Sequence, residues 1–410
     1  MTERSVIIAG AGIAGLTAAL SFAAEGFSVT IFERAERLDE AGAGLQISPN
    51  ATRILRRLGV LEPLAADAIQ PSSIALRRAA DLADLAQVPL GKEAERRWGA
   101  PYLVAHRADL QRALLDAVRA IPAIRLHLDA EVNRISFADG QAHVTVKQSE
   151  KLHKAESKLV IGSDGVWSKL RLLAGGNHSR FSGHIAFRTV LDTERLPRSH
   201  RGLVLSSDVV SALLAPDFHI VAYPLRNARE INLVAVTKGA DMEARWANEM
   251  DTGQLTTALQ RTAPELARAI HTADWRAWPI HTASARDRWT YAGRLALIGD
   301  AAHAMTPYAA QGAAMAIEDA ALLAGLAGQS NDIPAALEKF EHLRRPRIAR
   351  VARRASFNHF VWHARGPVAL ARDLVLRRRE GADLAADLDW LYAYDVDNEI
   401  AAQSENCAAI

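Results

Sequence analysis

The stretch Ser5–Glu33, SVIIAGAGIAGLTAALSFAAEGFSVTIFE, decides the fold. It begins with a short apolar run, as expected of a strand that is buried on both faces of a parallel sheet. Gly10, Gly12 and Gly15 follow with the spacing G-x-G-x-x-G. Between a strand and a helix, such glycines allow a tight turn, the close approach of a pyrophosphate, and close packing of the helix on the strand. The stretch therefore predicts a nucleotide site.

The remainder of this stretch indicates a dinucleotide. Leu16–Ala24 predicts a helix whose N-terminal amides and dipole favour phosphate. The next strand, Ser28–Phe32, ends at Glu33, 18 residues beyond Gly15, where a carboxylate can accept a hydrogen bond from a ribose 2'-hydroxyl. A secretory signal is a poorer interpretation, because a signal would end at a cleavage site and would not continue as a strand. The motif by itself does not distinguish FAD from NAD.

Composition sets the broad class of the protein. With 410 residues, 49% of them hydrophobic, the chain can form two or three domains. Outside the first unit there is no apolar run of about 18 residues without glycine and charge, so we expect no membrane span. The single cysteine, Cys407, excludes an internal disulfide framework and fits a cytoplasmic protein. The net charge of +2 gives no general attraction to nucleic acid.

The strand, glycine turn and helix pattern recurs along the chain. Amphipathic helices are predicted from Pro49 and over His106–Ile121. Leu159–Ile161 and Leu295–Ile298 are apolar runs that enter glycine turns, whereas residues 61–100 are expected to be irregular and charged. The fold class predicted is α/β, with a Rossmann-like nucleotide-binding domain.

A different pattern occupies Phe181–Thr237. Short alternating runs separated by turn residues predict an antiparallel sheet. Since such a sheet does not continue a parallel one, we expect an inserted substrate domain and, after it, a C-terminal helical tail. The predicted limits are 1–72, 100–178 and 285–345 for the nucleotide-binding domain, 73–99 and 179–284 for the substrate domain, and 346–410 for the helical segment.

Three motifs together resemble those of the single-component FAD-dependent aromatic hydroxylases. They are the first glycine unit with Glu33, the sequence GSDGVWSKLR at Gly162–Arg171, and GDAAHAMTPYAAQGAAMAIEDA at Gly299–Ala320. The likeness covers most of the chain and is similar to the branch of salicylate hydroxylase, 3-hydroxybenzoate 6-hydroxylase and 6-hydroxynicotinate 3-monooxygenase. It implies hydroxylation of a phenolic or N-heteroaromatic substrate, expected to be carboxylated, through a flavin C4a-hydroperoxide, with NADH or NADPH and molecular oxygen as co-substrates. Accompanying decarboxylation is left open.

The resemblance also implies the residues that bind FAD. Asp300 would hold the ribityl hydroxyls, and the amides of Gly312 and Ala313 would face the pyrimidine edge of the isoalloxazine. Arg107 would lie along the pyrophosphate or the ribityl chain, although a surface salt bridge with Asp109 is an alternative. The remaining implied contacts are Gly10, Gly12, Ala14, Gly15, Glu33, Arg34, Ile47, Val132, Asp164 and Pro307.

The predicted sheet carries the candidate catalytic residues. Strand alternation places His219 and Tyr223 on one face, in an H-x-x-x-Y-P element that resembles the one with which this branch presents both rings to a phenol. An imidazole with an ordinary pKa of ~6.5 suits deprotonation of a ring hydroxyl. As an alternative, both are ordinary sheet residues. Gln46 is a third catalytic candidate, and Arg188 would bind substrate or bridge Asp192.

Other functions and partners were weighed on particular residues. Trp275 and Trp278 resemble a halogenase signature, but they lie three apart instead of two, and a non-catalytic redox sensor is a further alternative. His359 and His363 have a metal-ligand spacing without a third ligand, so we expect no metal. The aromatic tail at Leu388–Asp395 would pack on the flavin domain or in a homodimer. The expected partners are a small aromatic substrate and oxygen, with neither nucleic acid nor membrane.

Overall fold

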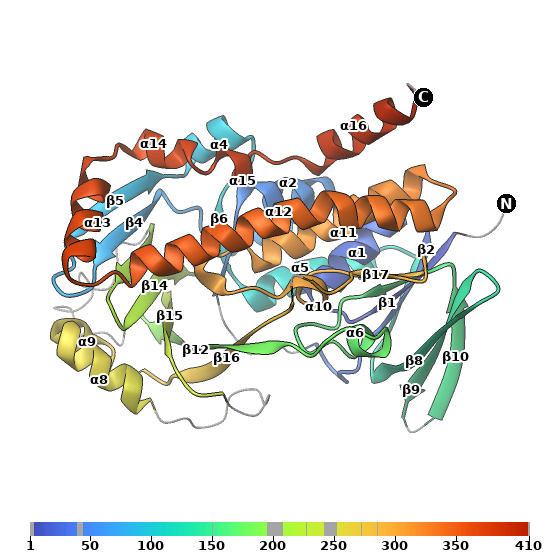
Figure 1. Cartoon of the computed structure of the whole chain (residues 1–410), viewed down its shortest axis with the longest axis horizontal. Coiled ribbons are helices and arrows are strands. Elements are labelled where there is room, and N and C mark those ends of the chain that lie inside the picture. Colours follow the sequence, from blue (N-terminus) through green and yellow to red (C-terminus); the bar gives the residue numbers. More distant parts are fainter. Residues whose placement is uncertain are drawn as a thin grey trace.

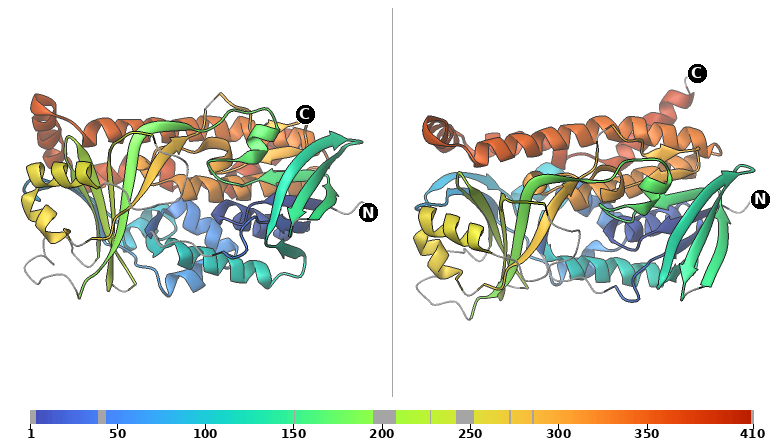
Figure 2. Two further views of the ribbon diagram at one scale, coloured as in Figure 1. Left: turned by 90° about the horizontal axis from the view of Figure 1, so that it is seen from below. Right: turned by 60° about the horizontal axis from the view of Figure 1, so that its bottom comes forward.

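The structure is a computed structural model that describes residues 4–38, 44–149, 151–194, 208–226, 228–241, 252–271, 273–284 and 286–408. Side chains are described up to residue 403, so that of Cys407 lies outside the described part. A parallel sheet and a larger, mainly antiparallel sheet lie at opposite ends of the molecule, joined by a long helix (Figures 1 and 2).

The six-stranded sheet contains the predicted nucleotide unit. Its strand order is β17-β18-β11-β1-β2-β7, with the bounds Thr290–Tyr291, Leu295–Leu297, Leu159–Gly162, Ser5–Ala9, Ser28–Phe32 and Ile124–His127. All neighbours are parallel except β17 and β18. Helix α1 (Ile13–Ala24) follows β1 and packs on the sheet. The α/β prediction made from the first stretch is confirmed.

The second sheet has seven strands in the order β16-β12-β15-β14-β13-β4-β5. Their bounds are Arg276–Thr282, Arg180–Asp192, Glu230–Lys238, Phe218–Leu225, Val209–Leu214, Ser73–Arg78 and Asp84–Pro89. Every neighbouring pair is antiparallel apart from β13 and β4. The predicted inserted sheet is therefore present, and it also recruits strands from the segment 73–89.

The expectation that residues 61–100 are irregular is wrong. This segment forms α3 (Leu61–Ala65), β4, β5 and α4 (Lys92–Trp98). Charges conceal the strands because β5 is the edge strand of the sheet and β4 lies next to it, so that long side chains reach water. Arg77 pairs with Asp84 across the two strands at 2.7 Å.

The two faces of the seven-stranded sheet have different coverings. Helices α8 (Gly253–Thr262) and α9 (Pro264–Ala269) bury one face, which is apolar and includes Phe187 and Ile220. The opposite face includes Ala186 and Val236, which pack with Tyr308 and with Ala355 of the long helix α12. Successive residues of a strand alternate between faces. The position of a residue along its strand therefore determines whether its side chain faces α8 and α9 or faces Tyr308 and α12.

The remaining strands form two smaller sheets. A two-stranded ribbon joins β3 (Gly44–Ile47) to β6 (Leu103–His106), and β8 (Ala130–Ala138), β9 (Gln141–Gln148) and β10 (Lys151–Ser157) form a third sheet. The intervening helices are α2 (Pro49–Arg57), α5 (Arg107–Arg119), α6 (Lys169–Leu173), α10 (Asp300–His303) and the 3-10 turn η1 (Pro307–Ala309).

The C-terminal part is helical: α11 (Gly312–Gln329), α12 (Ile333–Trp362), α13 (Gly366–Arg378), α14 (Gly381–Ala386), α15 (Asp389–Tyr392) and α16 (Val396–Ala408). Helix α12 has 30 residues and extends over both sheets (Figures 1 and 2). The aromatic tail is covered within the chain, because buried Tyr392 packs edge-on against Trp98 and Tyr102. None of the described helices is long and apolar enough to cross a membrane.

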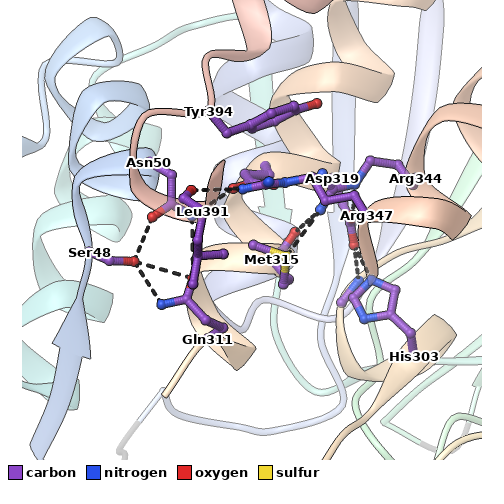
Figure 3. A network of polar contacts seen from close by, with 12 residues as sticks. Ser48, Asn50, His303, Gln311, Met315, Asp319, Arg344, Arg347, Leu391 and Tyr394 are labelled. Atoms are coloured by element: carbon purple, nitrogen blue, oxygen red, sulfur yellow. Dashed lines mark hydrogen bonds and ion pairs between the residues drawn. The ribbon is translucent and has the colours of Figure 1, made fainter. Parts of the chain in front are cut away.

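A buried ion-pair network joins α11 to α12 (Figure 3). Arg344 donates to Glu318 at 2.6 Å and to Asp319 at 2.7 Å, and all three side chains are fully buried. Burial alone would raise the pKa of Asp319, but His303 and Arg344 lower it to about 2. Asn50 of α2 donates to Glu318 at 2.6 Å. The network therefore connects α2, α10, α11 and α12.

Removal of the central arginine should destabilise the fold strongly. Arg344→Met removes the cation that contacts both buried carboxylates, so we expect the free energy of unfolding to fall by about 3–5 kcal/mol. Denaturant unfolding measures this change. Arg353→Met, at an exposed position of the same helix, is the control and should change stability little. Equal effects of the two substitutions would contradict a stabilising network.

Candidate functional site

In the first glycine turn, Gly10 and Gly15 have no room for a side chain, whereas Gly12 has. Gly10 has a φ of +104°, and a Cβ on it would lie 2.6 Å from the Ser163 carbonyl oxygen. A Cβ on Gly15 would lie 1.9 Å from the Gly10 carbonyl oxygen. Gly12 precedes α1, and no atom lies within 4 Å of the position its Cβ would take. The open position is the one that a phosphate must approach.

Glu33 holds the same turn from the adjacent strand end. Its Oε2 accepts a hydrogen bond from the amide of Ala11 at 2.7 Å, and its Oε1 accepts one from the amide of Ala35 at 2.9 Å. The carboxylate thus lies beside the glycine turn while its second lone pairs stay available to hydroxyl donors. Its neighbour Arg34 is exposed.

The other two motifs meet this turn at one edge of the parallel sheet. Asp164 follows β11, and its buried Oδ1 has no hydrogen-bond partner among the described residues. Asp300 follows β18 after Gly299, whose amide donates to Asp319 at 2.9 Å. The carboxyl ends of parallel strands form the usual ligand site of such sheets.

Several motif positions at this edge are open. Asp300, Pro307 and Gly312 are exposed, and nothing lies within 4 Å of a Cβ built on Gly312. Gly312 and Ala313 begin the 18-residue helix α11, so their amides belong to the positive end of its dipole. These amide donors suit the anionic groups of a dinucleotide, and the Oδ1 of Asp164, which has no described partner, could accept from one of its hydroxyls. The remaining predicted contacts are dispersed around them, with Ile47 buried on β3, Val132 buried on β8, Ala14 in α1 and Arg107 at the start of α5.

The substrate candidates share the sheet face that looks toward η1 and α12. His219 pairs with Val236, and Tyr223 pairs with Asn232. Directly paired residues share a face, as do alternate residues of one strand. Arg188 lies on this face opposite Val234, and its guanidinium is 5.4 Å from the centre of the Trp278 ring. The structure thus brings His219, Tyr223 and Arg188 to one surface.

The β3 strand approaches this surface closely. The Gly44 amide donates to Oδ1 of Asn232 at 2.7 Å, and a Cβ on Gly44 would lie 2.6 Å from the Tyr223 ring. Gln46, two residues further on, accepts a hydrogen bond from the Tyr102 hydroxyl at 2.7 Å. Burial raises the pKa of Tyr223, which therefore keeps its proton at neutral pH. Only a glycine leaves room for this ring at position 44.

His219 lies in a cluster of rings from three elements. Its ring centre is 5.3 Å from that of Tyr308 in η1, 4.9 Å from Trp362 and 5.2 Å from His363 at the end of α12. The His219 side chain is only 2% exposed. Burial, followed by the neighbouring histidines, lowers its pKa well below the ordinary value. The ring is therefore neutral at pH 7 and can accept a proton.

Comparison with known proteins fits this arrangement. The FAD binding domain family matches residues 3–355. The chain is 31% identical to 3-hydroxybenzoate 6-hydroxylase of Polaromonas naphthalenivorans (strain CJ2), over 97% of this chain and 98% of that protein. It is 34% identical to 3-amino-4-hydroxybenzoate 2-monooxygenase PtmB3 of Streptomyces platensis, over 95% and 96%.

The chain belongs to the FAD-dependent aromatic hydroxylases. Its fold is also that of a salicylate hydroxylase solved as a substrate complex, with a TM-score of 0.78, 24% identity and 97% of each chain covered. The family resemblance read from the three motifs is confirmed, and FAD is the dinucleotide. Hydroxylation is favoured over halogenation and over a non-catalytic sensor, because the relatives are named hydroxylases and monooxygenases.

Reasoning from the sequence of this hydroxylase missed part of the ring cluster. Tyr308 lies inside the third motif, and Trp362 and His363 lie in the segment 346–410 that was predicted to be helical, yet none was assigned to the site. The spacing of His359 and His363 was the available signal, but it was weighed only as a possible metal-ligand spacing and set aside because no third ligand accompanies it. No group of three or more His, Cys, Asp or Glu side chains in the described ranges could hold a metal ion.

Loss of the Glu33 carboxylate should weaken FAD binding in this hydroxylase. Glu33→Ala removes an acceptor for the ribose and the support of the Ala11 amide, so we expect FAD to dissociate more readily while the protein stays folded. The measurement is the dissociation constant of FAD, with thermal unfolding as the check on the fold. Glu36→Ala, three residues away and exposed, is the control. Unchanged FAD affinity in Glu33→Ala would show that the Glu33 carboxylate does not bind the ribose.

A Cβ at position 44 should displace Tyr223. We expect Gly44→Ala to lower stability by roughly 1–3 kcal/mol, the usual cost of overpacking, and to weaken the binding of an aromatic ligand. The cost should shrink in a Tyr223→Ala background, because the contacting ring is then absent. Unfolding of the two single variants and the double variant measures this coupling. Additive effects would show that the two sites do not contact.

Proposed function

We propose that this hydroxylase inserts one oxygen atom of O₂ into the ring of a small aromatic acid that carries a ring hydroxyl, with NADH or NADPH as the reductant. The main support for this proposal is that His219, Tyr223 and Arg188 lie on the same face of the seven-stranded sheet. Relatives named 3-hydroxybenzoate 6-hydroxylase and 6-hydroxynicotinate 3-monooxygenase act on such compounds by name. The latter, from Bordetella bronchiseptica, is 31% identical over 98% of both chains.

The predicted FAD contacts are part of this proposal. Gly12 would let the pyrophosphate approach, Glu33 would accept from the ribose, and Asp300 would accept from the ribityl hydroxyls. The amides of Gly312 and Ala313 would face the electron-rich edge of the ring system. When bound and reduced by NAD(P)H, FAD would supply the two electrons that activate O₂ as an electrophile toward the aromatic ring, and the second oxygen atom would leave as water.

His219 takes the proton from the ring hydroxyl of the substrate, which makes the ring a better nucleophile. Burial lowers its pKa, so the resting imidazole is neutral and has a lone pair for the proton, although it is a weaker base than a free imidazole. Tyr223 remains protonated, because burial raises its pKa, and its hydroxyl can donate to the substrate oxygen. Arg188 provides a positive charge for the carboxylate. Gln46 would use its amide nitrogen, since its oxygen already accepts from Tyr102.

We also propose a cytoplasmic location and a homodimer for this enzyme. A single cysteine fits a cytoplasmic enzyme. Exposed apolar side chains on α13, namely Val368, Leu370, Leu374 and Val375, would suit a homodimer contact. The domain limits given above are supported by the strands that each sheet contains.

Replacement of the two strand residues should separate reduction from hydroxylation. In His219→Asn/Tyr223→Phe we expect FAD binding and NAD(P)H oxidation to persist while hydroxylated product falls by ~10²-fold or more, the usual contribution of a general base. Product and hydrogen peroxide are counted against NAD(P)H consumed. His153→Asn, an exposed histidine on β10, is the control. Wild-type coupling in the double variant would exclude this role.

Stopped-flow reduction distinguishes the hydroxylase from a binding protein. A panel of phenolic and N-heteroaromatic acids should contain compounds that accelerate reduction of bound FAD by NAD(P)H. A redox sensor without substrate would show the same reduction rate with every member of the panel.

A further inference from the structure

The hydrogen bonds of the ring cluster continue from His219 to His363 and then to the backbone of α12. Its Nδ1 lies 3.2 Å from Nε2 of His363, and Nδ1 of His363 lies 2.9 Å from the carbonyl oxygen of His359. The carbonyl can only accept, so Nδ1 of His363 carries the proton in this contact. In a neutral ring the other nitrogen is then an acceptor.

The direction of the second hydrogen bond follows from the first. Since Nε2 of His363 accepts, Nδ1 of His219 must be the donor. This assignment leaves Nε2 of His219 with its lone pair free, and in the part of the chain that the structure describes no hydrogen bond reaches that atom. The carbonyl at the end of α12 thereby determines which nitrogen of a buried strand residue is the base.

The two histidines differ in their access to water. His219 is buried, whereas His363 is half-buried and lines a cavity of about 700 Å³ between α8 and the end of α12. Charged groups of that cavity are Asp217, Lys238, Arg261 and Arg365. A positive charge that is shared with His363 is better hydrated than one confined to His219.

We propose that His363 is a positioning residue for the hydroxylation, an inference that rests on the proposed role of His219. It holds His219 in the tautomer with the proton on Nδ1 and accepts that hydrogen bond throughout. When the substrate hydroxyl loses its proton, the O–H bond breaks and an N–H bond forms at Nε2 of His219. The resulting imidazolium shares its positive charge with His363 through the bond from Nδ1. The proton returns by the same atom to the product.

The groups that face His363 are consistent with a neutral acceptor in the resting enzyme. They are His184 on β12, His219 on β14, Lys238 on β15, His359 on α12, Tyr308 in η1 and Arg365 after α12. None of them is an anion at neutral pH, and Asp217 in the same cavity is paired with Arg261 and Arg365. Mainly through burial, the pKa of His363 is lowered to about 4.

Three variants of the FAD-loaded enzyme test the inference. His363→Phe keeps the volume of a ring but cannot accept a hydrogen bond, whereas the amide oxygen of His363→Gln can. His359→Phe, one turn earlier, changes a ring of the same cluster but keeps its carbonyl. We expect coupling of NAD(P)H consumption to product to fall about tenfold in His363→Phe, less than the ~10²-fold or more expected when the base itself is lost, and to stay within about twofold of wild type in the other two.

The pH profile distinguishes positioning from loss of structure. Coupling in His363→Phe should recover as the pH rises, because a phenol ionises without a base near its own pKa of about 10. A packing defect would not recover in this way. Coupling that stays low up to the pH at which the substrate ionises, or an equal loss in His359→Phe, would overturn the inference.

A readout that does not depend on turnover is the tautomer itself. Nitrogen NMR of histidine-labelled enzyme, with His219 assigned by its absence in His219→Asn, should find the proton of His219 on Nδ1 in the wild type and in His363→Gln. A proton on Nε2 in the wild type would exclude the inference even if His363→Phe failed to fold. If His219→Asn uncouples the enzyme while His363→Phe does not, the inference fails and the proposed function stands. If His219→Asn stays coupled, the proposed function itself fails.

Discussion

The fold depends on two adjacent carboxylates that are ionised inside the protein. Glu318 and Asp319 are consecutive, fully buried residues of α11, and neither could keep its charge there without compensation. Arg344 contacts both, and His303 lies 2.5 Å from Asp319. An unpaired buried charge costs so much that alternative helix registers are excluded. The pair therefore requires α12 and α10 in one arrangement.

This arrangement determines the geometry of the site at both ends. Asp319 accepts from the Gly299 amide, which fixes the turn that presents Asp300. At the start of α11, Gln311 donates to Ser48 at 3.0 Å and so ties Gly312 to the β3–α2 corner. Helix α12, held by Arg344, then continues across the seven-stranded sheet until His363 meets His219. One buried network thus relates the flavin-binding edge to the substrate face.

Local patterns predicted most of this fold, and long-range pairings account for what they could not reveal. The glycine unit and the alternation around His219 and Tyr223 are local properties, so the sheets and the shared face were predictable. Strand β4 pairs in parallel with β13, more than 130 residues away, and its charged residues conceal its alternation. Likewise, the spacing of His359 and His363 indicates only that the two side chains lie one helix turn apart, and not what they contact. His219, the partner of His363, lies 144 residues earlier, beyond any local pattern.

Two buried histidines show how the same side chain is committed to different tasks. His303 contacts a carboxylate that Arg344 also holds, so a change in its charge would disturb the network on which the fold depends. His219 is surrounded instead by rings, and its one described hydrogen-bond partner is another imidazole. Among the described residues, no carboxylate is hydrogen-bonded to it. His219 is buried and neutral in the resting enzyme, and its neighbour His363 is a polarisable ring that is only half-buried. His219 can therefore gain a proton and lose it again, as a base for a ring hydroxyl must.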